Sequence, residues 1–509
     1  MRTLKLLLSG ILLVFISCNC EKENTNPENR NVLVYKNILQ PVPDVEAYSP
    51  NKIKQTIISE LNNNNDFRWS KFDLHFIWSV SQVSKLVAIG YMPHDFQNFD
   101  EKIHTIDISS DDWKAVHDSL IAAVLNDLNQ QGIQKLKKED IVYEDDKILP
   151  IIIFRLTDKY AITHLQNLKN VRYVEPYGYW PDDQNRSTSG CSASTTALNV
   201  SDYSTILPNC ILPWNYTNLN IPAAWNIATG ENIQIGVIDG GISSSQSLLN
   251  GQFNSGYSNN SRTITTDYTY GSSAFTSCTH GNSMCGLVAG PRNNQNGVTG
   301  VAYKSSLHFI HGCEDVVLDQ SSELSGIKNA LIKMGNIPNL RIISMSIGTP
   351  FYSGVLNDGV NYAYGKGKMI FAAAGTSFSW TSWTGVVYPA ALAKCIAVTG
   401  VKENGNTCSS CHDGSQVKFT IPMERNTNSN RNSLSLSYSG VTPTYIGGSS
   451  CATATAAGIA ALVWSAKPSL TRAQILDCLK NTSQFPSGVN NHGYGNMNAL
   501  AAVTLAQTL

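Results

Sequence analysis

Beyond about Leu212, short and almost entirely apolar stretches alternate with helical stretches rich in glycine and alanine. Strands that are covered on both faces have this composition, because the crossover connections of a parallel sheet place helices on both of its sides. The pattern predicts an α/β layered domain with a mostly parallel central sheet and right-handed crossovers. The expected strands are Ile233 to Ile238, Ser306 to Ile310, Ile342 to Met345, Met369 to Ala374 and Cys395 to Val401, with helices at Ser283 to Val288 and Ser322 to Met334.

The chain before this domain mixes strand and helix patterns over shorter distances. Between about Val45 and Trp180, the two periodicities alternate, which predicts a small α+β domain. The expected elements are a strand at Leu86 to Tyr91, a helix at Asp111 to Leu128, a buried strand at Leu149 to Leu156, a short helix at Lys159 to Leu168 and a strand at Val171 to Tyr177.

The N-terminus has the composition of an export signal. Arg2 and Lys5 form a basic start, and Leu6 to Ile16 form an apolar stretch that is too short to span a bilayer as a helix. The sequence Phe15-Ile16-Ser17-Cys18 resembles the lipobox of bacterial lipoproteins, in which the chain is cut before the cysteine and the cysteine is then lipidated. The resemblance implies lipidation of Cys18, and ordinary signal-peptidase cleavage nearby is the alternative.

Between the two domains, Pro181 to Pro208 is rich in Ser, Thr, Asp and Asn and shows no periodicity, so we expect an exposed linker. Cys191 and Cys210 bracket most of this segment and could close it as a disulfide loop. The chain then divides into a signal peptide (1–17), a tether (18–44), the small domain (45–180), the linker (181–211) and the larger domain (212–509).

Charge and cysteine content exclude some classes of function. The formal net charge is −1 and only 15% of the residues are charged, so no overall field attracts nucleic acid. The chain contains 12 cysteines, which is many for a reducing cytosol and fits an exported protein with several disulfides.

Three reactive side chains occupy the positions where parallel α/β sheets carry their chemistry, at strand ends and helix starts. Asp239 follows the first apolar strand, His280 begins a helix, and Ser450 begins the helix that runs to Trp464. A carboxylate, an imidazole and a hydroxyl are the parts of a nucleophilic triad, in which the imidazole takes the hydroxyl proton and returns it to the leaving group.

These residues lie in motifs that resemble those of the subtilisin-like serine proteases, or subtilases. The segment Val237 to Gly241 (VIDGG) is similar to the aspartate motif, and His280-Gly281 is similar to the start of the histidine helix. The segment Gly448 to Thr453 (GSSCAT) resembles the serine motif. The resemblance implies a subtilisin-like three-layer domain and an endopeptidase in which Asp239 orients His280 and Ser450 is the nucleophile.

The same resemblance implies a function for the small domain. Its strand, helix and strand at Ile151 to Pro176 are similar to the end of subtilase propeptides, which assist folding and block the active site until they are cleaved. The resemblance implies a ferredoxin-like inhibitory domain and self-cleavage between Trp180 and Leu212.

Substrate-binding segments also resemble those of the family. Two segments line the expected peptide-binding cleft, one that pairs with extended substrate and one that walls the specificity pocket, and extended recognition of this kind depends mainly on main-chain hydrogen bonds. Their site residues are Ser346, Ile347 and Gly348 in the first segment and Ala373, Ala374 and Gly375 in the second.

The residue after Gly375 departs from the family pattern. Subtilases have asparagine there, whose amide donates to the oxyanion, whereas this chain has Thr376. We expect Thr376 and the Ser450 main-chain N–H to form a weaker oxyanion hole.

Several cysteines allow more than one interpretation. Cys408-Ser409-Ser410-Cys411-His412 matches c-type haem attachment and could be half of a zinc site, but a disulfide-bearing surface turn is favoured. Cys278 and Cys285 flank His280, and structural bridges that anchor the histidine are the expected role. Cys451 could be a thiol nucleophile, but a buried apolar position or a disulfide is favoured. We expect no required cofactor and assign no metal ligands. Family members often bind calcium, but no segment here matches a defined calcium loop.

The sequence therefore predicts a serine endopeptidase made as a self-processing zymogen and exported from a bacterial cell. Its expected partners are protein or peptide substrates, its own propeptide and, through the lipid on Cys18, the membrane of the cell envelope or surface, with release as a soluble protein as the alternative. Two other functions remain open, a degenerate subtilase that serves as a surface binding or scaffold protein, and a peptide ligase or cyclase on the same fold.

Overall fold

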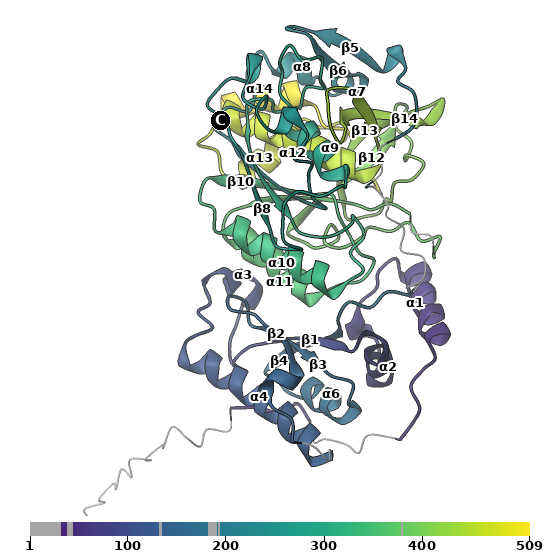
Figure 1. Cartoon of the computed structure of the whole chain (residues 1–509), viewed down its shortest axis with the longest axis vertical. Coiled ribbons are helices and arrows are strands. Elements are labelled where there is room, and N and C mark those ends of the chain that lie inside the picture. The colour runs from purple at the N-terminus through teal and green to yellow at the C-terminus, as the bar shows by residue number, and fades with distance from the viewer. Residues whose placement is uncertain (1–31, 38–43, 132–134, 182–190, 192–193, 378–379) are drawn as a thin grey trace, which may run out of the picture.

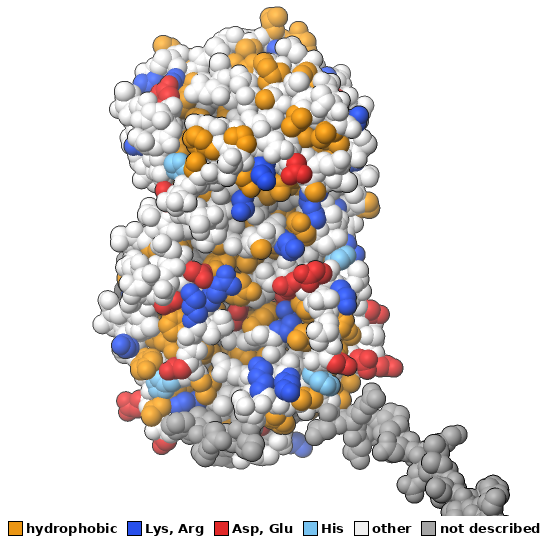
Figure 2. Space-filling model, turned by 180° about the vertical axis from the view of Figure 1, so that it is seen from behind, with side chains coloured by type: hydrophobic (Ala, Val, Ile, Leu, Met, Phe, Trp, Pro, Cys, Tyr) orange, Lys and Arg blue, Asp and Glu red, His pale blue; other side chains and the backbone are white. Residues whose placement is uncertain are grey.

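The computed structural model describes residues 32–37, 44–131, 135–181, 191, 194–377 and 380–509. The predicted signal peptide and Cys18 therefore lie outside the described residues. Two bodies, each built around its own sheet, stand one above the other in Figure 1, with the smaller, N-terminal body below. On the face shown in Figure 2, charged side chains gather more densely on the lower half, and the surface of the upper half is largely uncharged.

The larger body contains a nine-stranded sheet with the order β15-β14-β13-β12-β11-β10-β7-β9-β8. From β8 to β13 every neighbouring pair is parallel, and β14 and β15 are added antiparallel at one edge. The predicted mostly parallel sheet is confirmed. The strands are β7 (Gln234–Asp239), β8 (Ile264–Tyr268), β9 (Ser306–His311), β10 (Leu340–Met345), β11 (Met369–Ala373), β12 (Cys395–Lys402), β13 (Val417–Arg425), β14 (Asn428–Leu436) and β15 (Pro443–Ile446).

Helices cover both faces of this sheet and complete the three-layer α/β fold. Successive residues of a strand face opposite sides, so in β10 Ile342 packs into the cluster with α9 and α12, and Ile343 packs into the cluster with α10 and α11. Within the described residues, α12 alone is long and apolar enough to cross a membrane, but 89% of its most apolar window is buried, so it is the core helix. The helices are α7 (Trp214–Asn218), α8 (Ile221–Ala224), α9 (His280–Ala289), α10 (Ser321–Gly335), α11 (Gly354–Gly365), α12 (Gly448–Ala466), α13 (Arg472–Asn481) and α14 (Ala499–Thr508).

The smaller body is an antiparallel four-stranded sheet with the order β2-β3-β1-β4. Helix α4 connects β1 to β2 and α6 connects β3 to β4, which is the ferredoxin-like arrangement that the sequence predicts. Its elements are α1 (Pro50–Asn64), α2 (Leu74–Ser84), β1 (Leu86–Tyr91), α3 (Phe99–Lys102), α4 (Asp111–Gln131), α5 (Lys138–Ile141), β2 (Val142–Asp145), β3 (Ile151–Arg155), α6 (Lys159–Gln166) and β4 (Val171–Pro176).

One segment in the predicted tether is structured. The main-chain N–H of Lys36 donates to the carbonyl of Asn167 at 2.7 Å, so the end of the tether packs on the smaller body.

The predicted linker is also structured in part. Strands β5 (Tyr203–Ile206) and β6 (Cys210–Pro213) form a hairpin on the larger body. Just before it, Asp202 is fully buried and accepts hydrogen bonds from the side chains of Arg425 and Arg431. Most residues of this part are exposed, as expected, but a buried carboxylate with two guanidinium partners holds the segment on the larger body.

The two bodies meet where α10 and α11 face the small sheet (Figure 1). Arg172 on β4 forms two hydrogen bonds to the Asp358 carboxylate on α11, at 2.9 Å and 2.5 Å. Lys328 on α10 is fully buried and pairs with Glu144 and Asp146 of the smaller body. Buried charges are tolerated when they are paired in this way, so the contact is specific to this relative placement.

Candidate active site

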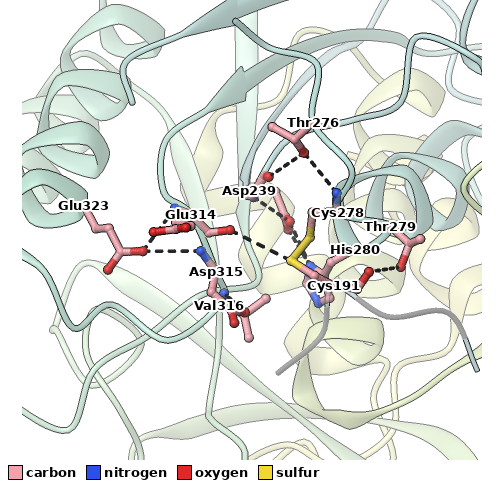
Figure 3. Close-up of a disulfide and its surroundings, with 11 residues drawn as sticks. Cys191, Asp239, Thr276, Cys278, Thr279, His280, Glu314, Asp315, Val316 and Glu323 are labelled. Atoms are coloured by element: carbon pink, nitrogen blue, oxygen red, sulfur yellow. Dashed lines mark hydrogen bonds and ion pairs between the residues drawn. A yellow bond between two sulfur atoms is a disulfide. The ribbon is translucent and has the colours of Figure 1, made fainter. Parts of the chain in front are cut away.

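An aspartate and a histidine meet at the carboxyl edge of the large sheet. Asp239 is the last residue of β7 and His280 is the first residue of α9. The Nδ1 atom of His280 lies 2.8 Å and 2.9 Å from the two carboxylate oxygens of Asp239 (Figure 3). The main-chain N–H of Gly240 also donates to this carboxylate at 2.8 Å. Because Asp239 holds Nδ1, the other ring nitrogen is left to accept and return a proton.

The surroundings of His280 favour its charged form. Burial by itself would lower the pKa of His280, but the charge and hydrogen bond of Asp239, with a smaller contribution from Asp315, raise the pKa above its ordinary value. Stabilisation of the imidazolium is the role that the carboxylate plays in a triad.

Ser450 lies in the first turn of α12, which packs directly against α9. Its hydroxyl donates to the carbonyl of Ser346 at 3.4 Å, and the Ser346 hydroxyl donates to the Ser450 carbonyl at 3.0 Å. Within the described part of the chain, no hydrogen bond joins Ser450 to His280. Hydrogen bonds between catalytic groups are often long in the absence of substrate, so the serine keeps its candidate role. The free N–H groups of this helix start favour negative charge nearby.

Next to Ser450 is a pocket that collects most of the predicted substrate-binding residues. Of the six, five line it, and Ala374 does not. Ala374 is fully buried behind the wall, where its main chain bonds to Val398 and Val387. The residues that line the pocket are Val316, Val317, Ser346, Ile347, Gly348, Ala373, Gly375, Thr376, Val387, Ser449 and Ser450.

Four of the lining residues, Val316, Val317, Val387 and Ser449, were not predicted as site residues. Val387 lies in an irregular segment after β11, and its side chain lies where a Cβ atom on either Gly348 or Gly375 would point. No local pattern marks it, because its position depends on the fold of a long connection. Ser449 could have been found from its place beside the nucleophile.

The strand expected to pair with substrate already has main-chain partners. The Gly348 N–H donates to the carbonyl of Val316 at 2.8 Å, and the Gly348 carbonyl accepts from the Leu318 N–H at 2.9 Å. An extended peptide that uses these same groups must first separate the two segments.

Thr376 lies half-buried at the pocket between the wall and the serine helix. Its methyl carbon lies 3.0 Å from the position that a Cβ atom on Gly448 would occupy, so this glycine gives the threonine room. Beside it, the Ser449 hydroxyl donates to the Gly375 carbonyl at 2.9 Å and lies 3.0 Å from the Gly375 nitrogen. These two contacts join α12 directly to the pocket wall at Gly375.

The Cys-x-x-Cys-His segment supports this wall. Cys408 and Cys411 form a disulfide, which confirms the disulfide-bearing turn and leaves no thiol for haem or zinc. His412 is fully buried, bonds through Nδ1 to the Gly385 carbonyl at 2.7 Å, and lies against the Cα of Gly375. Burial lowers the pKa of His412 to about 4, so this histidine is neutral and structural.

A second disulfide lies beside the Asp239–His280 pair (Figure 3). It joins Cys191 to Cys278, so the predicted bridge between Cys191 and Cys210 is wrong. The predicted anchoring of the histidine segment is confirmed for Cys278 and wrong for Cys285, which is a buried free thiol. The Cys191 carbonyl accepts hydrogen bonds from both the N–H and the hydroxyl of Thr279, at 3.1 Å and 2.9 Å. The residue before His280 is therefore fixed by a covalent bond and two hydrogen bonds.

The remaining six cysteines of the described residues are buried thiols, so the chain forms fewer bridges than expected. Cys451 is fully buried, and burial raises its pKa to about 12. A thiol nucleophile at this position is therefore wrong, because the thiolate is not available at neutral pH. Within the described ranges, no group of three or more His, Cys, Asp or Glu side chains is arranged to hold a metal ion.

Comparison with known proteins indicates the same family as the sequence motifs. The sequence profile of the peptidase S8, Subtilase family, matches residues 230–496. The chain is 30% identical over 292 residues to Subtilisin BL of Lederbergia lenta, which covers 57% of this chain and 98% of that protein. It is 32% identical over 294 residues to Subtilisin E of Bacillus subtilis, which covers 57% of this chain and 71% of that protein.

A solved structure, fervidolysin from Fervidobacterium pennivorans, has the same fold. Fervidolysin is a keratinolytic enzyme related to subtilisin. The match has a TM-score of 0.56 and 18% sequence identity, and it covers 82% of this chain and 60% of that chain. A mostly parallel sheet between two helical layers, with Asp239 and His280 at its carboxyl edge, is the subtilisin-like fold. The chain belongs to the subtilase family, and it is a serine endopeptidase.

Proposed function

We propose that Ser450, His280 and Asp239 hydrolyse peptide bonds through an acyl-enzyme. The observation that carries the proposal is the Asp239–His280 pair at the carboxyl edge of the sheet, with Ser450 at the neighbouring helix start and in the pocket wall. His280 takes the Ser450 proton as the hydroxyl oxygen attacks the carbonyl carbon, and it gives this proton to the leaving amine. Water then attacks the acyl-enzyme with His280 as base, which frees the serine.

The negative oxygen of the tetrahedral intermediate needs donors. We assign this role to the main-chain N–H of Ser450 and to Thr376, which both border the pocket. No cofactor takes part in this scheme, and protein or peptide chains are the substrates.

Replacement of Thr376 by valine is expected to lower kcat by about ten- to a hundredfold, because a donor to the oxyanion is lost while the shape is kept. Replacement by asparagine is expected to raise kcat, because a longer amide donor reaches further. Steady-state kinetics on a peptide substrate measure both. An unchanged kcat in Thr376→Val, beside an inactive Ser450→Ala, would show that Thr376 is not a donor.

We further propose that the smaller body, residues 45–180, inhibits the protease until it is cleaved off. After its last strand, the Trp180 ring packs on the larger body, with its centroid 6.1 Å from that of Phe351 and 5.6 Å from that of Trp380. The Tyr177 hydroxyl lies 2.9 Å from the Ser325 hydroxyl on α10. Trp180 and Cys191 thus both contact the larger body, which supports self-cleavage within 181–211.

The inhibitory contact is expected to weaken as pH rises. Glu175 is buried in the interface, where its carboxylate accepts from the Gly354 N–H at 2.8 Å. Burial, with a smaller contribution from the charge of Asp358, raises its pKa to about 8 against the opposing effects of the Gly354 N–H, Arg172 and Arg68. In the separated body Glu175 returns toward its ordinary pKa of 4.5. Between pH 4.5 and about pH 8 the bound body therefore keeps the Glu175 proton that the free body loses. The affinity of the smaller body for the protease is greatest at low pH and falls across this pH range by up to about tenfold per pH unit.

Gel filtration of the processed protein at pH 5, 7 and 9 in a reducing agent, which breaks the Cys191–Cys278 bridge where it joins the two parts, should measure this effect as the fraction of the N-terminal body that stays bound. Glu175→Gln is the matched variant, because it keeps the shape and removes the ionisation. Its retention is expected to change less with pH than that of the wild type. Equal pH dependence in the two proteins would exclude Glu175 as the source.

We also propose export and lipid anchoring of the chain. The basic and apolar N-terminus and the lipobox-like Phe15 to Cys18 support this proposal. The two disulfides also support an oxidising compartment. Mass analysis of the mature N-terminus is expected to find a lipid on Cys18, and an unmodified terminus elsewhere would favour ordinary cleavage.

The central experiment is labelling with a serine-directed fluorophosphonate, which should mark the wild type and spare Ser450→Ala. Labelling of the variant would show that another residue is the nucleophile. Failure to label the wild type would favour the binding or scaffold function. Product masses from a peptide substrate in the presence of a second amine then separate hydrolysis from ligation. We expect hydrolysis products, and a ligated product as the main species would favour the ligase.

A further inference from the structure

A large groove opens at the edge of the sheet opposite the active site. Parallel strands place their amino ends together, and the groove is bordered by the starts of β11 and β12, the end of α12 and the first turns of α13. Its volume is about 670 Å³. Sites that enclose a small ligand measure roughly 300–1,000 Å³, so the volume does not distinguish a small ligand from a segment of chain, and the lining of the groove decides between them.

Positive charge dominates the lining of the groove. Lys394, Lys418, Arg472 and Lys480 line it, against the single carboxylate of Asp477. Within the described residues, none of the three lysines forms an ion pair. Arg472 bonds to the main-chain carbonyls of Tyr364 and Lys368, at 2.6 Å and 2.9 Å, so it has no carboxylate partner either.

Aromatic rings lie between these cations. The Tyr364 ring has the Arg472 guanidinium 3.4 Å and the Lys394 ammonium 4.9 Å from its centroid. The Lys480 ammonium lies 5.3 Å from the centroid of Tyr494. Such contacts hold the side chains beside apolar surface without neutralising their charge. The groove thus combines an apolar floor with a rim of cations that lack anionic partners.

The groove and the active site are linked by one helix. Ser450 begins α12 and Trp464, near its other end, lines the groove, which places the two about 21 Å apart along the helix. This line runs through the buried core helix, so a substrate has to pass around the surface. A folded substrate protein can do so, and an unfolded segment needs more than the roughly seven extended residues that 21 Å would take.

We propose that this groove is a second binding site that recruits substrate proteins through an acidic polypeptide segment with apolar or aromatic side chains. Carboxylates of the segment meet the lysines, and its apolar side chains cover Tyr364 and Tyr494. A polypeptide fits better than a polysaccharide or a nucleic acid, because the chain acts on polypeptides and the floor is apolar. The proposal depends on the endopeptidase activity of the family and not on the assignment of the triad.

The binding test uses full-length Ser450→Ala and a fluorescein-labelled peptide that repeats Glu-Glu-Phe-Glu three times. A second peptide with Gln in place of Glu is the charge control, and mass analysis after the titration confirms that the probe is intact. The double variant Lys394→Gln/Lys480→Gln removes two groove cations. The matched double variant Lys304→Gln/Lys333→Gln removes two cations that pair with Glu231 and Asp267 elsewhere.

We expect the groove variant to weaken binding of the acidic peptide by tenfold or more in fluorescence anisotropy, and the matched variant by less than twofold. The Gln peptide is expected to bind at least tenfold more weakly than the acidic one. Equal binding by the groove variant, or equal binding of the two peptides, overturns the proposal. Binding of heparin but not of the peptide would also overturn it and assign the groove to an anionic polysaccharide.

A kinetic test in the wild-type background gives a second readout. A peptide substrate is compared with the same substrate carrying the acidic repeat about ten residues from the cleaved bond. The repeat is expected to lower KM severalfold with kcat unchanged, and the groove variant is expected to lose this gain while it cleaves the short substrate normally. A gain that persists in the groove variant contradicts recruitment by this groove.

Discussion

Replacement of Ser450 by alanine is expected to lower kcat by about 10⁶-fold, which is the size of the effect that subtilisin itself shows when its nucleophile is removed. The physical reason is the loss of the oxygen that forms the acyl-enzyme. The pocket and helix α12 are expected to persist, because the alanine keeps the Cβ and only the 3.4 Å hydrogen bond to the Ser346 carbonyl is lost. The same variant should remain a single uncleaved chain, because self-processing uses the same serine.

Two measurements check this prediction. Initial rates on a peptide substrate give the loss of turnover, and intact-mass analysis beside N-terminal sequencing shows whether residues 181–211 are cut. Ser465→Ala is the matched control, because it removes a hydroxyl from the far end of the same helix, where it donates to the Leu462 carbonyl and accepts from the Gly230 N–H, each at 3.1 Å. The control is expected to retain normal turnover and processing. Full processing of Ser450→Ala would mean that another protease makes the cut.

Replacement of Asp239 by asparagine is expected to lower kcat by about 10⁴-fold, as in the corresponding change in serine proteases. The amide keeps the size of the side chain but can donate to His280 Nδ1, which favours the wrong tautomer of the ring. It also removes the charge that raises the pKa of His280, so burial then lowers this pKa. The imidazolium that forms during attack loses its stabilising partner.

The loss should appear in kcat more than in KM, because Asp239 does not line the pocket beside Ser450. Asp267→Asn is the matched control, since this carboxylate pairs with Lys333 at the exposed surface and its variant is expected to change kcat by less than twofold. A twofold or smaller loss in Asp239→Asn would contradict the assigned role. Circular dichroism and thermal unfolding of both variants separate a chemical effect from misfolding.

The sequence predicted five of the nine strands of the large sheet, β7, β9, β10, β11 and β12, because the signal of a buried parallel strand is local. No bounds were predicted for β8, β13, β14 and β15, which lie toward the two edges of the sheet. Ile342 and Ile343 pack on opposite faces of β10, so a continuous apolar run already implies two covered faces. The end of β7 and the start of α9 were predicted in the same way, which is why the Asp239–His280 pair could be expected before any distance was known.

The features that the sequence did not predict depend on contacts between distant segments. The pairing of Cys191 with Cys278 over a separation of 87 residues has no local signal. The order around Asp202 depends on Arg425 and Arg431, which follow more than two hundred residues later. Four consecutive asparagines have the composition of a loop, yet Asn62 to Asn64 form the last turn of α1 and Asn65 ends the helix with a φ of 52°.

The bridge beside His280 decides what self-cleavage would yield. If the cut falls before Cys191, the mature protease is one chain with its new N-terminus held near the active site. If the cut falls between Cys191 and Leu212, the Cys191–Cys278 bond joins the N-terminal fragment to the protease as a two-chain molecule. In that case cleavage alone does not release the inhibitory body, and reduction of the disulfide or a second cut is needed to release it. Electrophoresis of the processed protein with and without a reducing agent distinguishes the two outcomes by the size of the largest species.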